Sequence, residues 1–232
     1  MNNKKTIILG LILTPVIFLV SVFTGVNIHI DIELIPGSFM QHLLMLLLSC
    51  IAIWIMRKDL NFNIALPEFK KIFKPFFIGV LIMLIVNIPM TVITYLVEGK
   101  AANNPLLEEM TGLQAFLFIF ILASTAEEFL FRGFLLNSLK PLKEKGITII
   151  KLRLSLPVII SAVAFGLVHL ILITTGADYM LLTRTVLFTF VLGIAAGYYQ
   201  EKYENNTAYA IIVHMGGNLL GVVSSIIMHI QT

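Results

Sequence analysis

The chain has 232 residues, of which 58% are hydrophobic and only 12% charged, and its mean hydropathy is +0.96. A soluble globular domain carries about twice that share of charged residues, so the composition indicates a membrane protein and excludes a disordered or collagenous chain. Cys50 is the single cysteine, which excludes an intramolecular disulfide and a cysteine-based metal cluster. The net charge of +3 does not indicate a nucleic-acid partner, because most of the basic residues lie outside the apolar stretches, as in a membrane protein.

Seven apolar stretches are each long enough to cross a bilayer as a helix, which takes about 20 residues. They cover residues 6–26, 39–56, 76–97, 113–139, 156–175, 181–199 and 207–229. Their apolar runs are continuous rather than alternating, so helices and not barrel strands are expected. The sequence therefore predicts an all-α fold, a polytopic transmembrane helical bundle that forms one integral membrane domain over residues 1–232.

Charge placement predicts how this bundle is oriented. Most of the 16 Lys and Arg fall on one side of the predicted spans, at Lys4, Lys5, Arg57, Lys58, Lys70, Lys71, Lys74, Lys140, Lys143, Lys145, Lys151, Arg153 and Lys202. The positive-inside rule makes that side cytoplasmic, so the N-terminus is expected inside and the C-terminus outside. The basic segment 57–75 is expected either to lie along the inner surface as an amphipathic helix or to be a plain loop.

Ionisable side chains inside a bilayer cost several kcal/mol unless they are paired or hydrated, so each is a candidate functional residue. The candidates lie on three of the stretches, at Glu127, Glu128, Arg132, His169 and His214, and Asn218 follows the last of them. Arg184 lies near the outer end of the sixth stretch, where its side chain can reach the interface, and is assigned no role. At about 1.5 Å per residue, Glu127 and His169 lie roughly 18 and 20 Å from the cytoplasmic ends of their helices, and His214 roughly 11 to 16 Å. The three side chains are therefore expected to meet at one level.

Helical spacing assigns these side chains to faces. Glu128 and Arg132 are four residues apart and can neutralise each other, whereas Glu127 is rotated by about 100°. Two neighbouring carboxylates in a low dielectric cannot both ionise cheaply, so this pairing leaves Glu127 as the candidate general base. His214 and Asn218 are also four apart and form a two-donor face suited to a developing oxyanion. A buried ion pair or interhelical histidines would explain each group alone, but not their shared depth.

Three motifs on successive helices resemble those of the CPBP family, in the order Glu127-Glu128-x-x-x-Arg132, Phe165-x-x-x-His169 and His214-x-x-x-Asn218. This family comprises CAAX proteases and bacteriocin-processing enzymes, is also called the Abi family, and includes the type II CAAX prenyl endopeptidases. The likeness covers about 127–218 and makes 113–229 the catalytic core helices.

The resemblance implies an intramembrane endopeptidase with four catalytic residues. Glu127 and His169 would activate a water molecule, while His214 and Asn218 would stabilise the tetrahedral intermediate. The remaining motif residues, Glu128, Arg132 and Phe165, would orient and pack against the site.

Zinc is the open alternative for the water-activating chemistry. Two histidines and one glutamate are a plausible catalytic zinc set, here Glu127, His169 and His214. The helix-borne His-Glu-x-x-His signature is absent from the sequence, and a Glu-His pair can activate water unaided. A metal-free mechanism is therefore favoured.

The expected partners are the lipid bilayer and a membrane-associated peptide or protein substrate. Lys outnumbers Arg, and Ile and Asn are frequent, which is typical of an AT-rich bacterial genome. By family analogy, this favours bacteriocin or other peptide processing, or self-immunity, at the cell membrane. Two rival functions stay open: a non-catalytic membrane scaffold or immunity protein, and a proton-coupled transporter, whose paired broken spans the sequence lacks.

Overall fold

The computed structural model of the chain describes residues 2–99, 110–149 and 151–230. Its longer helices are α1 (Asn3–Asn27), α2 (Phe39–Ile55), α3 (Phe69–Glu98), α7 (Leu156–Val168), α8 (Tyr179–Lys202) and α9 (Thr207–Ile230). Residues 112–136 form one continuous helical stretch of α5 (Gly112–Gln114), η1 (Ala115–Ala123), α6 (Ser124–Glu128) and η2 (Phe129–Leu136). The short elements are η3 (Lys140–Leu142), β1 (Gly146–Ile149), β2 (Leu152–Ser155) and η4 (His169–Thr175).

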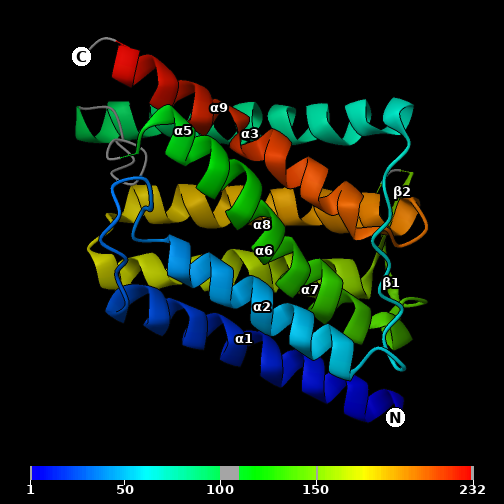
Figure 1. Cartoon of the computed structure of the whole chain (residues 1–232). Helices are drawn as coiled ribbons and strands as arrows, with labels where there is room; N and C mark the ends of the chain where they lie inside the picture. Colours follow the sequence, from blue (N-terminus) through cyan, green and yellow to red (C-terminus); the bar gives the residue numbers. More distant parts are fainter. Residues whose placement is uncertain (1, 100–109, 150, 231–232) are drawn as a thin grey trace.

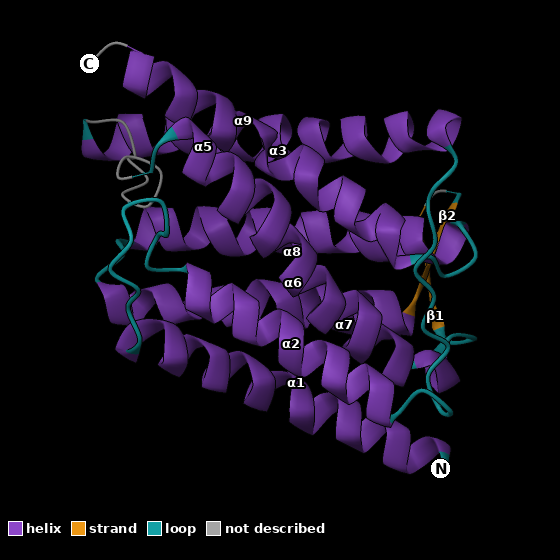
Figure 2. Ribbon diagram, in the orientation of Figure 1, coloured by secondary structure: helices purple, strands orange, loops and turns teal. Residues whose placement is uncertain are grey.

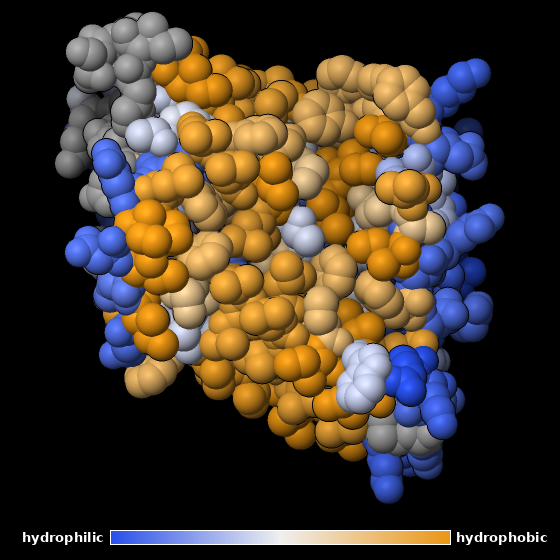
Figure 3. All heavy atoms as spheres, viewed as in Figure 1, coloured by the Kyte–Doolittle hydropathy of each residue, from blue (hydrophilic) through white to orange (hydrophobic). Residues whose placement is uncertain are grey.

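In the part of the chain that the structure describes, six helical stretches are long and apolar enough to cross a membrane, and α2 is a further apolar helix of 17 residues. The predicted polytopic helical bundle is therefore confirmed, and the chain is an integral membrane protein. Figure 3 shows the corresponding surface, a broad apolar band between two hydrophilic edges. The cytoplasmic location of the N-terminus stays a prediction from the positive-inside rule.

The helices lie side by side, as Figure 1 shows, with α1 and α2 along one edge of the bundle and α3 and α9 along the other. Helix α8 packs against α3, α7 and α9. The 112–136 stretch crosses the bundle obliquely and contacts α2, α7 and α9. The stretch that carries Glu127 and Glu128 thus contacts three other helices, and one of these, α9, carries His214 and Asn218.

Two local features depart from the predicted elements. Strands β1 and β2 form an antiparallel hairpin at the end of the bundle that carries the N-terminus (Figure 2), in which Ile147 pairs with Leu154 and Ile149 with Leu152. Alternating apolar and polar positions suit such a strand pair. Helix α3 begins at Phe69, so segment 57–75 is neither a surface helix nor a plain loop: residues 57–68 are non-helical and the rest belongs to α3.

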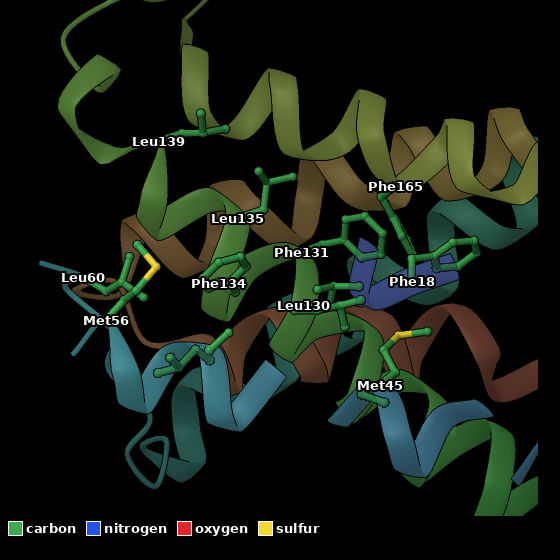
Figure 4. Close-up of a cluster of buried hydrophobic side chains, with 14 residues drawn as sticks. Phe18, Met45, Met56, Leu60, Leu130, Phe131, Phe134, Leu135, Leu139 and Phe165 are labelled. Carbon is green, nitrogen blue, oxygen red and sulfur yellow. The ribbon is translucent and has the colours of Figure 1, made fainter. Parts of the chain in front are cut away.

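The largest buried apolar cluster joins α1, α2, η2 and α7 (Figure 4). Its central side chains include Phe18, Met45, Phe131, Phe134 and Phe165. Lipid tails are as apolar as these side chains, so the cluster stabilises the bundle through close van der Waals packing rather than through exclusion from water. It also forms the apolar wall behind the candidate site, because Phe165 contacts site residues.

Helices α3 and α9 cross at unusually close range through two glycines. A Cβ atom on Gly79 would lie 2.0 Å from the carbonyl oxygen of Val213, and one on Gly216 would lie 2.1 Å from that of Phe76. Both contacts are with backbone, which cannot yield as a flexible side chain can. The crossing therefore fixes α9, the helix of His214, against α3.

A group of buried amide side chains holds the end of the bundle together; we call Asn137, Gln200, Asn205 and Asn206 the amide cluster. The Asn205 amide nitrogen donates to the Asn61 carbonyl and, over 2.6 Å, to the Asn137 side-chain oxygen. Gln200 donates to the Asn205 oxygen over 3.1 Å. These bonds tie the 57–68 segment to the turn between α8 and α9.

Candidate active site

The two candidate carboxylates lie on α6, a single α-helical turn between the π-helical stretches η1 and η2. Such wide turns are frequent at functional sites because they leave backbone carbonyls without their usual partners. Side chains satisfy some of these carbonyls here: Ser124 donates to Ile119 over 3.2 Å, and Asn137 donates to Arg132 over 2.9 Å. Local polar residues thus stabilise the distorted helix that presents Glu127 and Glu128.

Glu128 and Arg132 form a fully buried ion pair, with Arg132 Nε 3.1 Å from Glu128 Oε2. The guanidinium carbon lies 4.6 Å from the centre of the Phe165 ring, a cation–π contact. Gly193 on α8 makes room for the same group, since a Cβ there would lie 2.7 Å from Arg132 Nη2. The buried charges therefore offset each other, and Glu128 is committed to a structural pair.

Glu127 points away from this pair and is the more accessible carboxylate. Its side chain is 16% exposed, whereas that of Glu128 is 0% exposed. His42 Nε2 lies 3.6 Å from Glu127 Oε1, and His214 Nε2 lies 3.7 Å from Glu127 Oε2. Both distances exceed those of a direct hydrogen bond, about 2.7–3.2 Å. Each oxygen of Glu127 thus faces an imidazole from a different helix without forming a direct hydrogen bond to it.

In all three histidines of the site, Nδ1 faces a hydrogen-bond acceptor. Nδ1 of His42 lies 2.9 Å from the Ser38 carbonyl oxygen, and Nδ1 of His169 lies 2.8 Å from that of Phe165. A carbonyl only accepts hydrogen bonds, so Nδ1 carries the proton in both rings. Nδ1 of His214 lies 2.9 Å from Glu128 Oε1, which assigns its proton in the same way. All three rings therefore keep Nε2 available for chemistry.

Phe165 and His169 complete one side of the site. The Phe165 ring is fully buried and meets the His169 and His214 rings edge-on, with centroids 5.2 and 5.5 Å away. His169, the first residue of η4, is partly exposed. Phe165 thus holds two imidazoles in fixed positions relative to each other.

Asn218 lies one helical turn beyond His214 on α9 and is partly exposed. Its amide nitrogen donates to Ser124 Oγ over 3.0 Å, which ties α9 to the start of α6. An amide NH₂ has two donors, so one N–H is left for another acceptor. The sequence predicts that His214 and Asn218 form a two-donor face. In the structure, both ring nitrogens of His214 face carboxylates, Nδ1 that of Glu128 and Nε2 that of Glu127.

Sequence reasoning missed His42, which is 7% exposed and lies on α2. A signal was present: the helical rise places His42 roughly 20 Å from the inner end of its helix, close to the depths of Glu127 and His169. Within residues 2–99, 110–149 and 151–230, no group of three or more His, Cys, Asp and Glu is arranged to hold a metal ion. Zinc held by Glu127, His169 and His214 stays an untested alternative from the sequence.

A family model described as type II CAAX prenyl endopeptidase Rce1-like matches residues 109–220, a segment that holds every residue of the three sequence motifs. This match covers 112 of the 232 residues, and over this segment the chain is similar to the Rce1-like family. The predicted relationship to CAAX-type proteases is thereby confirmed, and peptidase activity is supported at the level of this protease family. No curated protein and no solved structure matches the chain. The Rce1-like segment excludes α1, α2 and α3, so His42 lies outside it.

Proposed function

We propose that the chain is a glutamate-dependent intramembrane endopeptidase of the cell membrane, with Glu127 as general base. One observation carries the proposal. Glu127 is a partly exposed carboxylate with imidazole Nε2 atoms 3.6 and 3.7 Å from its two oxygens, beside a second carboxylate already neutralised by Arg132. A carboxylate that is desolvated but unpaired is suited to take up a proton during a reaction.

Glu127 and His169 are proposed to activate a water molecule. A water molecule has two hydrogens, and Glu127 and the Nε2 lone pair of His169 are two acceptors for them. Held in this way, the water directs its oxygen at the scissile carbonyl carbon. The new carbon–oxygen bond forms as one proton passes to Glu127, and the carbonyl oxygen becomes an oxyanion.

Asn218 and His214 are proposed to stabilise that oxyanion. Asn218 has one amide N–H left beside its bond to Ser124, and His214 can donate from Nε2 when that atom is protonated. The tetrahedral intermediate collapses when the carbon–nitrogen bond breaks, and the leaving amine takes the proton that came from water. No step requires a metal ion, so we propose a metal-free reaction.

Glu128, Arg132 and Phe165 are proposed to position these groups rather than to react. Glu128 accepts from His214 Nδ1 and is itself held by Arg132, so the ion pair fixes the ring that faces Glu127. Phe165 contacts both His169 and His214. The catalytic core is then the helices of 113–229, as the sequence predicts.

The proposed substrates are peptides or proteins held at the membrane, because the carboxylate that carries the reaction lies on an apolar helix rather than in a water-exposed domain. The family name refers to prenylated CAAX proteins. For a bacterial chain we favour peptide precursors such as bacteriocins, processed for maturation or for self-immunity.

Terminal profiling of membrane proteins tests this function. Cells expressing the wild type, Glu127→Ala or Glu144→Ala at equal levels would be compared by mass spectrometry of peptides and of protein N- and C-termini. Glu144 is an exposed glutamate paired with Arg153 and serves as the matched control. Fragments present with the wild type and Glu144→Ala but lost with Glu127→Ala are expected, and they identify the substrate. Identical profiles from all three strains would favour the non-catalytic scaffold.

A further inference from the structure

His42 reaches the site from a part of the chain that the family match does not include. It lies on the buried face of α2 together with Met45 and Ser49, three and seven residues further along, both of which are fully buried. The Ser49 hydroxyl donates a hydrogen bond to the Met45 carbonyl of the same helix. His42 is therefore the side chain of this face that presents an unused polar atom to the bundle.

The short length of α2 explains how His42 reaches Glu127. With 17 residues, α2 is about 26 Å long, less than the roughly 30 Å of a bilayer core. In Figure 1 its first turn is set inward from the corresponding ends of α1 and α3. His42, the fourth residue of α2, therefore lies within the bundle, where α2 packs against α6.

The ring of His42 is held in one orientation. The Ser38 carbonyl accepts both the backbone N–H of His42, over 3.3 Å, and its Nδ1–H, over 2.9 Å. This leaves the Nε2 lone pair facing Glu127 Oε1 at 3.6 Å. Glu127 is the one carboxylate within 4.0 Å of this ring in the described part of the chain. Two facing acceptors can form a hydrogen bond only when one of them takes up a proton, and the two atoms then have to close from 3.6 Å to about 2.7–3.2 Å.

We propose that His42 is a positioning residue of the active site, whose Nε2 shares with Glu127 Oε1 the proton taken from the attacking water. This rests on the proposed function. The water oxygen–hydrogen bond breaks, the proton moves to Glu127 Oε1, and the His42 lone pair accepts a hydrogen bond from it. When the carbon–nitrogen bond breaks, the same proton passes to the leaving amine, so that Glu127 and His42 return to their starting state.

The test uses full-length protein in proteoliposomes, mixed with solubilised membrane extract from cells expressing Glu127→Gln, in which uncleaved substrate accumulates. Initial rates of fragment formation are compared for the wild type, Glu127→Gln, His42→Gln, His42→Ala and the control His29→Gln, whose ring is exposed in the loop after α1. Each variant is measured at full and at tenfold diluted extract, which separates kcat from KM. His42→Ala is also measured with added imidazole, which can occupy the cavity that the missing ring leaves.

A glutamine at position 42 fills the space and can hydrogen-bond, but its amide is a poor acceptor for a shared proton. We expect His42→Gln to lower kcat about 10- to 100-fold with KM unchanged, His29→Gln to match the wild type, and imidazole to restore part of the His42→Ala rate. A His42→Gln rate within about twofold of the wild type overturns the proposal, as does a slow His42→Ala that imidazole does not restore. If Glu127→Gln cleaves like the wild type, or the wild type forms no fragments, the proposed function itself fails.

Discussion

Two polar clusters are buried in this bundle, and they are built in opposite ways. The amide cluster consists of neutral groups, and Asn137, Gln200 and Asn205 each donate to a carbonyl or amide oxygen. The cluster around Glu127 contains charged groups whose acceptors face each other at 3.6 and 3.7 Å. The amide cluster leaves Gln200 Oε1 without a hydrogen-bond partner among the described residues, but its other bonds join neutral donors to neutral acceptors. The Glu127 cluster instead has unused lone pairs next to charged groups, and such lone pairs can take part in a reaction.

Glu127→Gln is the variant with the largest expected effect on activity. Replacing Glu127 by Gln removes the base but keeps its shape, so cleavage of the substrate should fall about 100- to 10,000-fold. Stability should hardly change, because Glu127 makes no direct hydrogen bond within the described residues. Cleavage rate and thermal unfolding, measured on the same preparation, check both statements. Equal losses in activity and stability would place Glu127 with the structural groups.

Breaking the ion pair should instead destabilise the fold. Arg132→Met leaves Glu128 buried without its cation, and such a loss costs about 3–5 kcal/mol of unfolding free energy. Arg153→Met is the matched control: its pair with Glu144 is exposed and should contribute at most about 1 kcal/mol. Denaturant unfolding in mixed micelles measures both changes. Similar values for the two variants would contradict the structural role of the buried pair.

A smaller effect is expected at the crossing of α3 and α9. Gly79→Ala forces a methyl group against the Val213 carbonyl, which should cost about 1–3 kcal/mol and displace the helix that carries His214. Gly37→Ala, a position with no atom within 4 Å of the new methyl group, is the control. Unfolding measurements should separate the two, and unchanged stability in Gly79→Ala would show that the helices can move apart freely.

A loss of stability of similar size, with no effect on activity, is expected in the amide cluster. Asn205→Ala leaves the Asn137 side-chain oxygen without its donor and should cost about 1–3 kcal/mol, while the cleavage rate per folded molecule stays unchanged. Glu204→Ala controls for backbone strain, because Glu204 and Asn205 have similar positive φ values of 56° and 60°. If Asn205→Ala lowers activity but not stability, the division between the two clusters is wrong.

Hydropathy and helical spacing were sufficient to predict the helical bundle and to select the residues of the Glu127 cluster on the 112–136 stretch, η4 and α9. They could not predict that η1 and η2 are π-helical, since this depends on hydrogen bonds such as that from Ser124 to Ile119. The β1–β2 hairpin is four residues per strand, too short for periodicity to separate it from a loop. The contact of His214 with both carboxylates depends on how helices cross, which sequence spacing within one helix does not contain.

The proposed role of Glu127 is to direct water at a peptide bond inside the membrane. Purified wild type and Glu127→Gln in proteoliposomes would be incubated in heavy-oxygen water with membrane extract from cells expressing Glu127→Gln. Mass spectrometry then counts fragments that carry one heavy oxygen at a new C-terminus. Such fragments are expected from the wild type, and none above background from Glu127→Gln. Labelled fragments formed at equal rates by both proteins, or by neither, would contradict it.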